Sequence, residues 1–196
     1  MAEGRFLKRA LLLAKRGSGA VSPNPMVGCV IVKNGKIIGE GYHKKFGGAH
    51  AEVEAIAAAG DSVEGADVYV NLEPCSHHGK TPPCADLLIE KKVARVIYGM
   101  EDPNPLVAGK GIQKLTSAGI AVEGPLLQDA SRELNKFFVK YISTGLPYIT
   151  LKIAASLDGR INADTGVQTQ ITSAASKKIV HKMRSLYDAI LTGVST

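Results

Sequence analysis

The chain has 196 residues, 45% of them hydrophobic, a length that fills one good-sized domain and something smaller but excludes two large domains. Its formal net charge of +6 suits an anionic partner, yet the lysines and arginines are scattered, tryptophan is absent and no basic run is interleaved with aromatic residues. A small phosphorylated substrate explains this charge as well as nucleic acid does, and the few aromatic residues weaken the case for binding single-stranded bases. We expect a small phosphorylated substrate and no nucleic-acid partner.

The N-terminal region and the cysteine content indicate the compartment. Residues 1–16 place charges on either side of a short apolar run without a cleavage pattern after it, so they do not predict a secretory signal. No apolar stretch approaches the roughly 20 residues that a membrane span needs. Three cysteines, an odd number, are poor material for a disulfide framework. We therefore expect a cytoplasmic protein with no membrane partner and with thiols that are free or bound to a metal.

The first part of the chain predicts a helix followed by a hairpin. Apolar residues recur at helical spacing over Glu3–Lys15, and Gly17 follows where such a helix would stop. After a Pro-Asn-Pro loop come two extended runs, Val27–Val32 and Lys36–Gly41. They are joined through Asn-Gly, the strongest short-range hairpin signal. The sheet should therefore begin with an antiparallel pair.

The chain then alternates between predicted helices and strands. In order these are the helix His50–Ala59, the strand Val68–Leu72, the helix Cys84–Lys92, the strand Arg95–Gly99, the helix Gly111–Ser117, the strand Ile120–Val122 and the helix Leu127–Ile142. Such alternation implies parallel strands with helices on both faces. We expect a three-layer α/β/α domain with a mixed sheet that ends near Gly145.

A different stretch begins at Pro147. It reads as the strand Tyr148–Ala154, the helix Ser173–Leu186 and the strand Ala189–Val194. One β-α-β unit is too little to bury both faces of a sheet. Either this segment docks on the first domain, or it begins a second domain that the chain does not finish.

A group of metal-binding side chains lies at predicted helix starts and strand ends. His50 starts a helix, Cys75 follows a strand directly, and Cys84 starts the next helix. In an open α/β sheet, sites form outside the carboxyl ends of the strands, where these positions converge. One imidazole and two thiolates leave a fourth tetrahedral position of a zinc ion open, which is typical of a catalytic site, and zinc held this way lowers the pKa of a water ligand toward about 7.

Glu52 is the predicted proton carrier of this site. It stands two residues after His50, and such positions do not share a face of a regular helix, so it should not be a fourth ligand. A carboxylate beside the zinc can take a proton from water and pass it to a ring nitrogen and then to the departing amine. His-x-Glu with Pro-Cys is the signature of zinc nucleobase deaminases.

The remaining cysteine and two other histidines call for less specific interpretations. Cys29 lies in an apolar strand and is expected to be a buried small hydrophobe. His181 sits among basic residues on an amphipathic helix, so a solvated face is the favoured interpretation. For His78, substrate contact and a plain loop position both stay open.

The two metal-ligating cysteines depart from the usual spacing of these deaminases. Most have Cys-x-x-Cys, whereas eight residues, Ser76 to Pro83, separate the cysteines here. A loop anchored at both ends by metal ligands should lie over the active site and help define the substrate.

These motifs resemble those of a known family. They are the run NLEPCSHHGKTPPC from Asn71 to Cys84, the triplet from His50 to Glu52, and SPNPMVG from Ser22 to Gly28. Together they resemble the deaminase domain of the bifunctional riboflavin-biosynthesis deaminase/reductase family, over 5–141. The resemblance implies the cytidine-deaminase fold and hydrolytic deamination of diaminohydroxyphosphoribosylaminopyrimidine, which gives 5-amino-6-(5-phosphoribosylamino)uracil and ammonia. Asn71 stands where that family more usually has threonine.

The resemblance also assigns roles to single residues. It implies that His50, Cys75 and Cys84 bind zinc and that Glu52 carries the proton. Six further positions match the family's substrate-binding set: Asn24, His43, His77, Lys80, Asp102 and Asn104. Chemistry supports several of them, because an amide can pair with a pyrimidine edge and a lysine suits a phosphate. For the Asp-Pro-Asn-Pro turn, pure turn chemistry remains the alternative.

The last part of the chain matches the same family. The run YITLKIAASLDGR from Tyr148 to Arg160 resembles the opening strand of its NADPH-dependent reductase domain, where Lys152 would be a cofactor contact. We expect a deaminase domain over 1–145 and an incomplete, dihydrofolate-reductase-like β-α-β segment over 146–196. NADPH would be a cofactor only if that domain were complete, so no reductase step is expected from this chain alone. A homo-oligomer is expected because such a segment leaves apolar surface uncovered.

Two other functions compete with this one. A tRNA or nucleotide deaminase shares the chemistry, but predicts Cys-x-x-Cys and, for tRNA, a concentrated basic surface. A non-catalytic scaffold stabilised by zinc is conceivable because metal binding can hold two helices together. That interpretation leaves Glu52 without a role.

Overall fold

A computed structural model of the chain describes residues 2–77, 82–105, 107–163, 166 and 169–194. The chain divides into two compact units, Met1–Tyr148 and Ile149–Thr196. None of the described helices is both long enough and apolar enough to span a membrane. The assignment of 1–145 to a deaminase domain and of 146–196 to a reductase domain stays a prediction.

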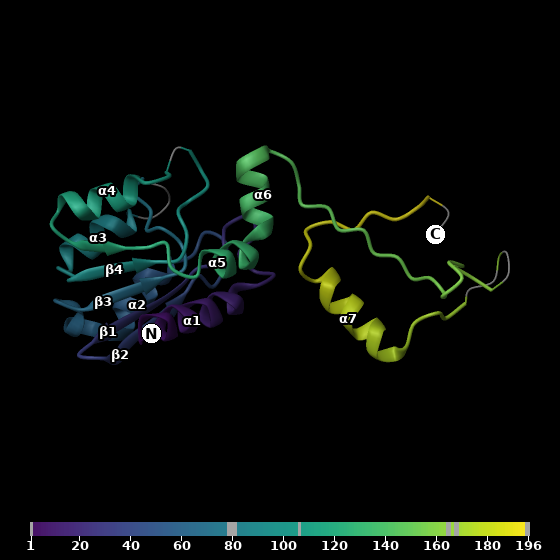
Figure 1. Ribbon diagram of the computed structural model, residues 1–196, viewed down its shortest axis with the longest axis horizontal. Helices are drawn as coiled ribbons and strands as arrows, with labels where there is room; N and C mark the ends of the chain where they lie inside the picture. Colours follow the sequence, from purple (N-terminus) through teal and green to yellow (C-terminus); the bar gives the residue numbers. More distant parts are fainter. Residues whose placement is uncertain (1, 78–81, 106, 164–165, 167–168, 195–196) are drawn as a thin grey trace. The chain divides into compact units, whose positions relative to one another are not determined.

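The first unit is built around a mixed five-stranded sheet with the order β2-β1-β3-β4-β5 (Figure 1). The strands are β1 (Gly28–Lys33), β2 (Lys36–Tyr42), β3 (Asp67–Val70), β4 (Arg95–Tyr98) and β5 (Ala121–Glu123). β1 pairs antiparallel with both β2 and β3, whereas β3, β4 and β5 run parallel. The predicted hairpin and the predicted parallel portion are both confirmed.

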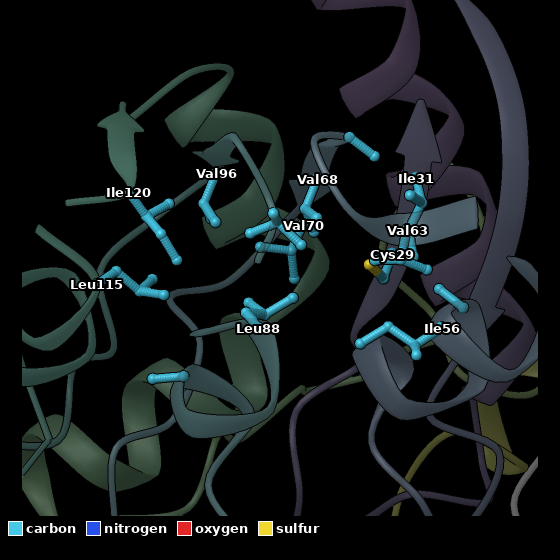
Figure 2. Close-up of a cluster of buried hydrophobic side chains, with 14 of the residues drawn as sticks. Cys29, Ile31, Ile56, Val63, Val68, Val70, Leu88, Val96, Leu115 and Ile120 are labelled. Carbon is cyan, nitrogen blue, oxygen red and sulfur yellow. The ribbon is translucent and has the colours of Figure 1, made fainter. Parts of the chain in front are cut away.

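One face of the sheet is covered by the helices α2 (Ala51–Ala59), α3 (Cys84–Glu90) and α4 (Lys110–Ser117). Their apolar side chains meet inward-facing β-branched residues of the central strands in one buried cluster (Figure 2). Leu88 of α3 and Leu115 of α4 are fully buried there. Alternate strand residues point to this face because side chains along a strand alternate between its two sides.

The opposite face is covered by α1 (Ala2–Ala14), with α5 (Gln128–Leu134) beside it. Leu7, Ala10 and Leu13 recur at helical spacing and pack with strand residues of β1, β3 and β4 in a second buried cluster. Short 3₁₀ turns follow α1 at Lys15–Gly17 and α2 at Gly60–Val63. The expected three-layer α/β/α architecture is therefore confirmed.

Close packing of α2 against β2 depends on Gly41. A Cβ atom at this position would lie 2.4 Å from the carbonyl oxygen of Ala51 and 2.4 Å from the amide nitrogen of Ala55. Both contacts are with backbone, which cannot rotate out of the way. The absence of a side chain at Gly41 thus sets how near the first turn of α2, which carries Glu52, lies to the sheet.

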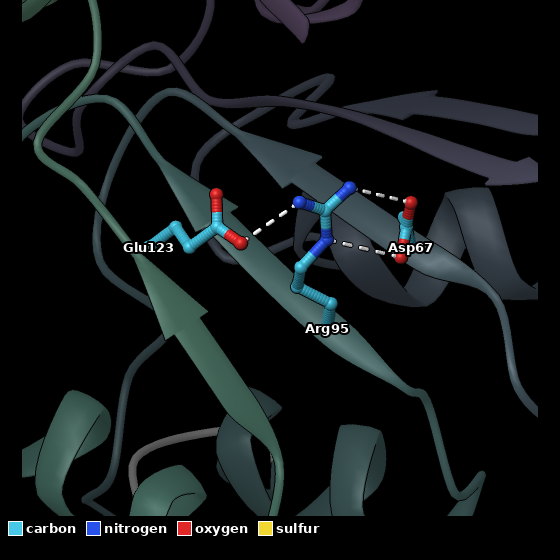
Figure 3. A network of polar contacts seen from close by, with 3 residues as sticks. All are labelled: Asp67, Arg95 and Glu123. Carbon is cyan, nitrogen blue, oxygen red and sulfur yellow. Dashed lines mark hydrogen bonds and ion pairs between the residues drawn. The ribbon is translucent and has the colours of Figure 1, made fainter.

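An ion-pair network joins the parallel strands at the end where β3 and β4 begin (Figure 3). The Arg95 guanidinium donates to both carboxylate oxygens of Asp67 on β3, at 3.3 and 2.9 Å, and to Glu123 on β5 at 2.8 Å. Planar two-point contacts of this kind are the strongest form of such pairs. The network ties the short edge strand β5 to the middle of the sheet.

The single helix predicted over Leu127–Ile142 is wrong. The segment forms two helices, α5 and α6 (Lys136–Thr144), that are separated at Asn135. The backbone of Asn135 leaves the helical region, with φ −105° and ψ 22°. Its side chain instead accepts a hydrogen bond from the Met26 amide at 2.7 Å and donates to the Met26 carbonyl at 3.0 Å.

The second unit contains the predicted helix but not the two predicted strands. α7 (Ala174–Arg184) begins after Ser173, whose hydroxyl caps it by accepting from the Ser176 amide at 3.2 Å. Tyr148–Ala154 and Ala189–Val194 form no strand. These segments lack a backbone ladder with each other or with another strand among the described residues, and a strand exists only through such a ladder.

Candidate active site

Three side chains that could hold a metal ion meet at the carboxyl end of β3. His50 immediately precedes α2, Cys75 follows β3, and Cys84 is the first residue of α3. One ligand atom from each residue lies within 4.8 Å of the other two. The Nδ1 atom of His50 is 3.2 Å from Sγ of Cys84 and 3.6 Å from Sγ of Cys75. The predicted convergence of these residues is therefore confirmed.

The geometry and chemistry of this donor set fit zinc. Zn–S bonds of about 2.3 Å and Zn–N bonds of about 2.0 Å in a tetrahedron imply ligand-to-ligand separations of roughly 3.5 to 3.8 Å. The observed separations are close to that range. Imidazole and thiolate donors also select zinc, whereas calcium and magnesium bind oxygen ligands.

The two cysteines are electrostatically distinct. The pKa of the Cys75 thiol falls from 9.0 to about 4, chiefly through a hydrogen bond from the Cys84 thiol, with a further contribution from His50. The pKa of Cys84 is raised by the same contact with Cys75 and by burial. Contact with Cys75 also raises the pKa of His50. Thiolate is the ligand form of cysteine, so Cys75 is ready to bind a cation at neutral pH.

Glu52 lies on the first turn of α2 and is buried, with 4% of its surface exposed. Burial raises the pKa of its carboxyl group, and the negative charge on Cys75 raises it further. Among the described residues, the group of candidate metal ligands contains His50, Cys75 and Cys84 but not Glu52. The carboxylate is thus beside the ligands without belonging to them, as a proton carrier requires.

Asn24 and His43 form a polar pair next to the metal ligands. His43 is buried, and its Nδ1 lies 2.9 Å from the Ala49 carbonyl, an acceptor, so Nδ1 is the protonated nitrogen. Nε2 then accepts from the Asn24 amide at 3.2 Å. The His43 ring meets the His50 ring edge-on, with centroids 5.8 Å apart.

The Asp102 turn approaches the site from the end of β4. Its Oδ1 atom accepts from the Asn104 amide at 2.9 Å, which is the turn chemistry noted as an alternative. The pKa of Asp102 is raised mainly by burial, whereas the nearby charge of His77 lowers it. His77 itself is exposed. Asn24, His43, His77, Asp102 and Asn104 thus lie around the same end of the sheet, and their roles stay predictions.

Lys80 and His78 lie outside the described residues. Lys152 is exposed in the second unit, and its role as a cofactor contact stays a prediction. Cys29 is fully buried and His181 is exposed, both as expected.

Sequence reasoning missed three buried polar residues that support the site. Asn71 accepts from the Gly28 amide at 2.7 Å and donates to the Met26 carbonyl at 3.0 Å. Asn135 binds the same Met26 backbone, so two amides hold the end of the loop that carries Asn24. The Glu73 carboxylate accepts hydrogen bonds from four backbone N–H groups in the segment that follows β4. A polar residue at the end of an apolar strand was the available signal for Asn71 and Glu73.

Comparison with known proteins supports the same site. The family model described as the cytidine and deoxycytidylate deaminase zinc-binding region matches residues 2–100, and the RibD C-terminal domain model matches 147–196. The riboflavin biosynthesis protein RibD of Bacillus amyloliquefaciens is 51% identical over 194 residues, which are 99% of this chain and 52% of that protein. The resemblance inferred from the motifs is confirmed.

Solved structures show the same correspondence. Acinetobacter baumannii RibD matches with a TM-score of 0.91 and 48% identity over 94% of this chain and 52% of that one. A diaminohydroxyphosphoribosylaminopyrimidine deaminase/5-amino-6-(5-phosphoribosylamino)uracil reductase from Thermotoga maritima matches with a TM-score of 0.89 and 46% identity, over 95% of this chain and 54% of that one. The chain thus spans about half the length of these relatives. It belongs to the family that carries the cytidine and deoxycytidylate deaminase zinc-binding region.

Proposed function

We propose that the chain is a zinc-dependent hydrolytic deaminase of diaminohydroxyphosphoribosylaminopyrimidine, which it converts to 5-amino-6-(5-phosphoribosylamino)uracil and ammonia. The observation that carries the proposal is the grouping of His50, Cys75 and Cys84 within 4.8 Å beside the buried carboxylate of Glu52. The substrate is suggested by the name of the Thermotoga maritima relative, which is 46% identical.

In this proposal each side chain of the site has one task. His50, Cys75 and Cys84 would hold zinc, which when bound makes water a nucleophile near neutral pH. A carboxylate oxygen of Glu52 takes one proton from the attacking water and delivers it to the ring nitrogen. It then takes the second proton, from the hydroxyl that the water has become on the ring carbon, and delivers it to the amine, which departs as ammonia. Burial supports this role because it raises the pKa of Glu52 and so makes the carboxylate a better base.

Substrate binding is assigned to the polar residues around the metal ligands. Asn24 and His43 are assigned to the edge of the pyrimidine, because the His43 ring meets the His50 ring and the Asn24 amide donates to His43. Asp102 and Asn104, on the turn that follows β4, are assigned to the substrate as well. His77 and Lys80, on the loop between the metal-ligating cysteines, are assigned to the ribose phosphate.

The direct test is ammonia release from the pyrimidine substrate by the purified chain, with and without a zinc chelator. Glu52→Gln should keep zinc and the fold but lower turnover by about 10²-fold or more, because the amide cannot accept the proton. Glu54→Gln on the same helix is the matched control. Glu54 pairs with Lys44 at 2.5 Å on the surface, so its loss should leave turnover unchanged.

The outcomes separate the rival functions. Turnover by Glu52→Gln equal to that of the unaltered chain would refute the mechanism. Release of ammonia from cytidine, deoxycytidylate or tRNA, but not from the riboflavin intermediate, would favour the nucleotide or tRNA deaminase. Zinc binding without turnover of any of these substrates would favour the zinc-stabilised scaffold.

We also propose that the chain forms a homo-oligomer. Leu157, Leu191 and Val194 in the second unit are almost fully exposed, and such apolar surface favours association. Sedimentation velocity on the chain at micromolar concentration should show a dimer or larger species; a monomer alone would contradict the proposal.

A further inference from the structure

The buried carboxylate of Glu73 connects the metal-binding segment to the Asp102 turn. Glu73 is 3% exposed and stands two residues before Cys75, and its own amide donates to the Met100 carbonyl at 2.9 Å. Its side chain accepts from four backbone amides of the segment that follows β4. One side chain therefore joins two stretches of chain that both border the proposed substrate position.

The two carboxylate oxygens serve different elements. Oε1 accepts from Gly111 at 2.9 Å and from Ile112 at 3.3 Å, the free amides in the first turn of α4. α4 has no capping side chain of its own, so Glu73 takes that role from a distant part of the sequence. Oε2 accepts from Asp102 at 3.2 Å and from Gly109 at 3.0 Å.

The backbone is shaped to allow this approach. A Cβ atom at Gly111 would lie 1.9 Å from the carbonyl oxygen of Pro74 and 3.1 Å from Oε1 of Glu73. The start of α4 thus packs directly on the Pro74–Cys75 segment. Asp102, held through its amide by Glu73, in turn accepts from the Asn104 amide.

We infer that Glu73 is a positioning residue that holds the Asp102–Asn104 turn at the distance from the metal ligands that substrate binding requires. This inference rests on the proposed function, since it assumes that the turn contacts the substrate. Glu73 is given an indirect role, because its buried carboxylate already accepts hydrogen bonds from four backbone amides. It acts through Asp102, and a glutamate that only capped α4 would have no effect on substrate affinity.

Glu73→Gln separates these two roles. A glutamine has one acceptor oxygen and one NH₂ group in place of two acceptor oxygens. The positive end of the α4 dipole favours the oxygen, so the NH₂ group should face the amides of Asp102 and Gly109. The substitution thus keeps the helix cap and loses the contacts to the turn. Leu115→Val is the control, because it weakens α4 by about 1 kcal/mol from the buried side without touching the turn.

The experiment measures KM, kcat, zinc content and amide hydrogen exchange on the full chain. For Glu73→Gln we expect KM to rise about tenfold or more with zinc content unchanged, and exchange to accelerate at Asp102 and Gly109 more than at Ile112. For Leu115→Val we expect unchanged KM. Because Glu73 acts through Asp102, Glu73→Gln combined with Asp102→Asn should raise KM by less than the product of the two single effects.

An unchanged KM in Glu73→Gln, or single effects that multiply fully in the double variant, would overturn the inference. So would exchange that accelerates equally at Asp102 and Ile112. Failure of the proposed function is a separate result, namely absence of ammonia release by the unaltered chain. In that case the hydrogen-exchange pattern alone decides whether Glu73 holds the turn.

Discussion

Replacing the two buried amides that hold Met26 tests whether they work as one unit. Asn71→Ala leaves the Gly28 amide without its acceptor, but the Met26 carbonyl keeps its bond from Asn135. Asn135→Ala leaves the Met26 amide without its acceptor, but the carbonyl keeps its bond from Asn71. Each single variant therefore orphans one N–H group, whereas the double variant orphans both of them and the carbonyl as well.

The expected losses in the free energy of unfolding follow from the number of backbone groups that each variant leaves without a hydrogen-bond partner. An unsatisfied buried N–H costs about 1 to 3 kcal/mol. We therefore expect each single variant to lower the free energy of unfolding by about 2 kcal/mol, and Asn135→Ala to lower it slightly less, because the hydrogen bonds of Asn135 are only partly buried. The double variant should lose about 1 kcal/mol more than the sum, because only there does the Met26 carbonyl lose both donors.

Urea unfolding of the full chain, followed by circular dichroism, measures these differences. Gln113→Ala is the matched control, because it removes an exposed amide from α4 and should change the free energy of unfolding by less than about 0.5 kcal/mol. Strictly additive losses at Asn71 and Asn135 would refute the reasoning, since they would mean that the shared carbonyl contributes nothing.

Two further predictions concern the exposed Arg9–Glu40 ion pair and the packing of Gly41 against α2. The pKa of Glu40 is lowered by its hydrogen bond to Arg9, so the pair stabilises the folded chain at a pH above the ordinary glutamate pKa of 4.5, and this stabilisation is lost as the pH falls through the lowered pKa. Arg9→Met should therefore lower the melting temperature slightly at pH 7 and not at pH 2; an equal difference at both would rule out the pair. Gly41→Ala should cost about 1 to 3 kcal/mol or more in thermal unfolding, because its Cβ meets the α2 backbone at 2.4 Å, and an unchanged midpoint would contradict the packing argument.

The sheet and the metal ligands were predictable from the sequence because their signals are local. Asn34-Gly35 marks the hairpin, extended runs between helical segments mark the strands, and His50, Cys75 and Cys84 stand at element ends that must converge in a parallel sheet. These predictions use only neighbouring residues and the rule that sites form outside the carboxyl ends of the strands.

The missed features depend on contacts between distant residues. The helix break at Asn135 comes from hydrogen bonds to Met26, 109 residues away, and no local pattern marks it. Glu73 caps α4 from 38 residues away in the sequence, so no capping residue precedes that helix. The segments Tyr148–Ala154 and Ala189–Val194 have the composition of strands, but composition does not supply a hydrogen-bonded neighbour.

The Asp67–Arg95 pair lies at the end of the parallel strands opposite to the metal ligands, since both residues begin their strands and Cys75 follows the end of one. Charged residues at one end of the sheet can therefore be changed to alter thermal stability, while the candidate active site lies at the other end. Substitutions around Arg95 can be screened for unfolding temperature with little risk to turnover, which makes that end the natural place to engineer a more robust protein.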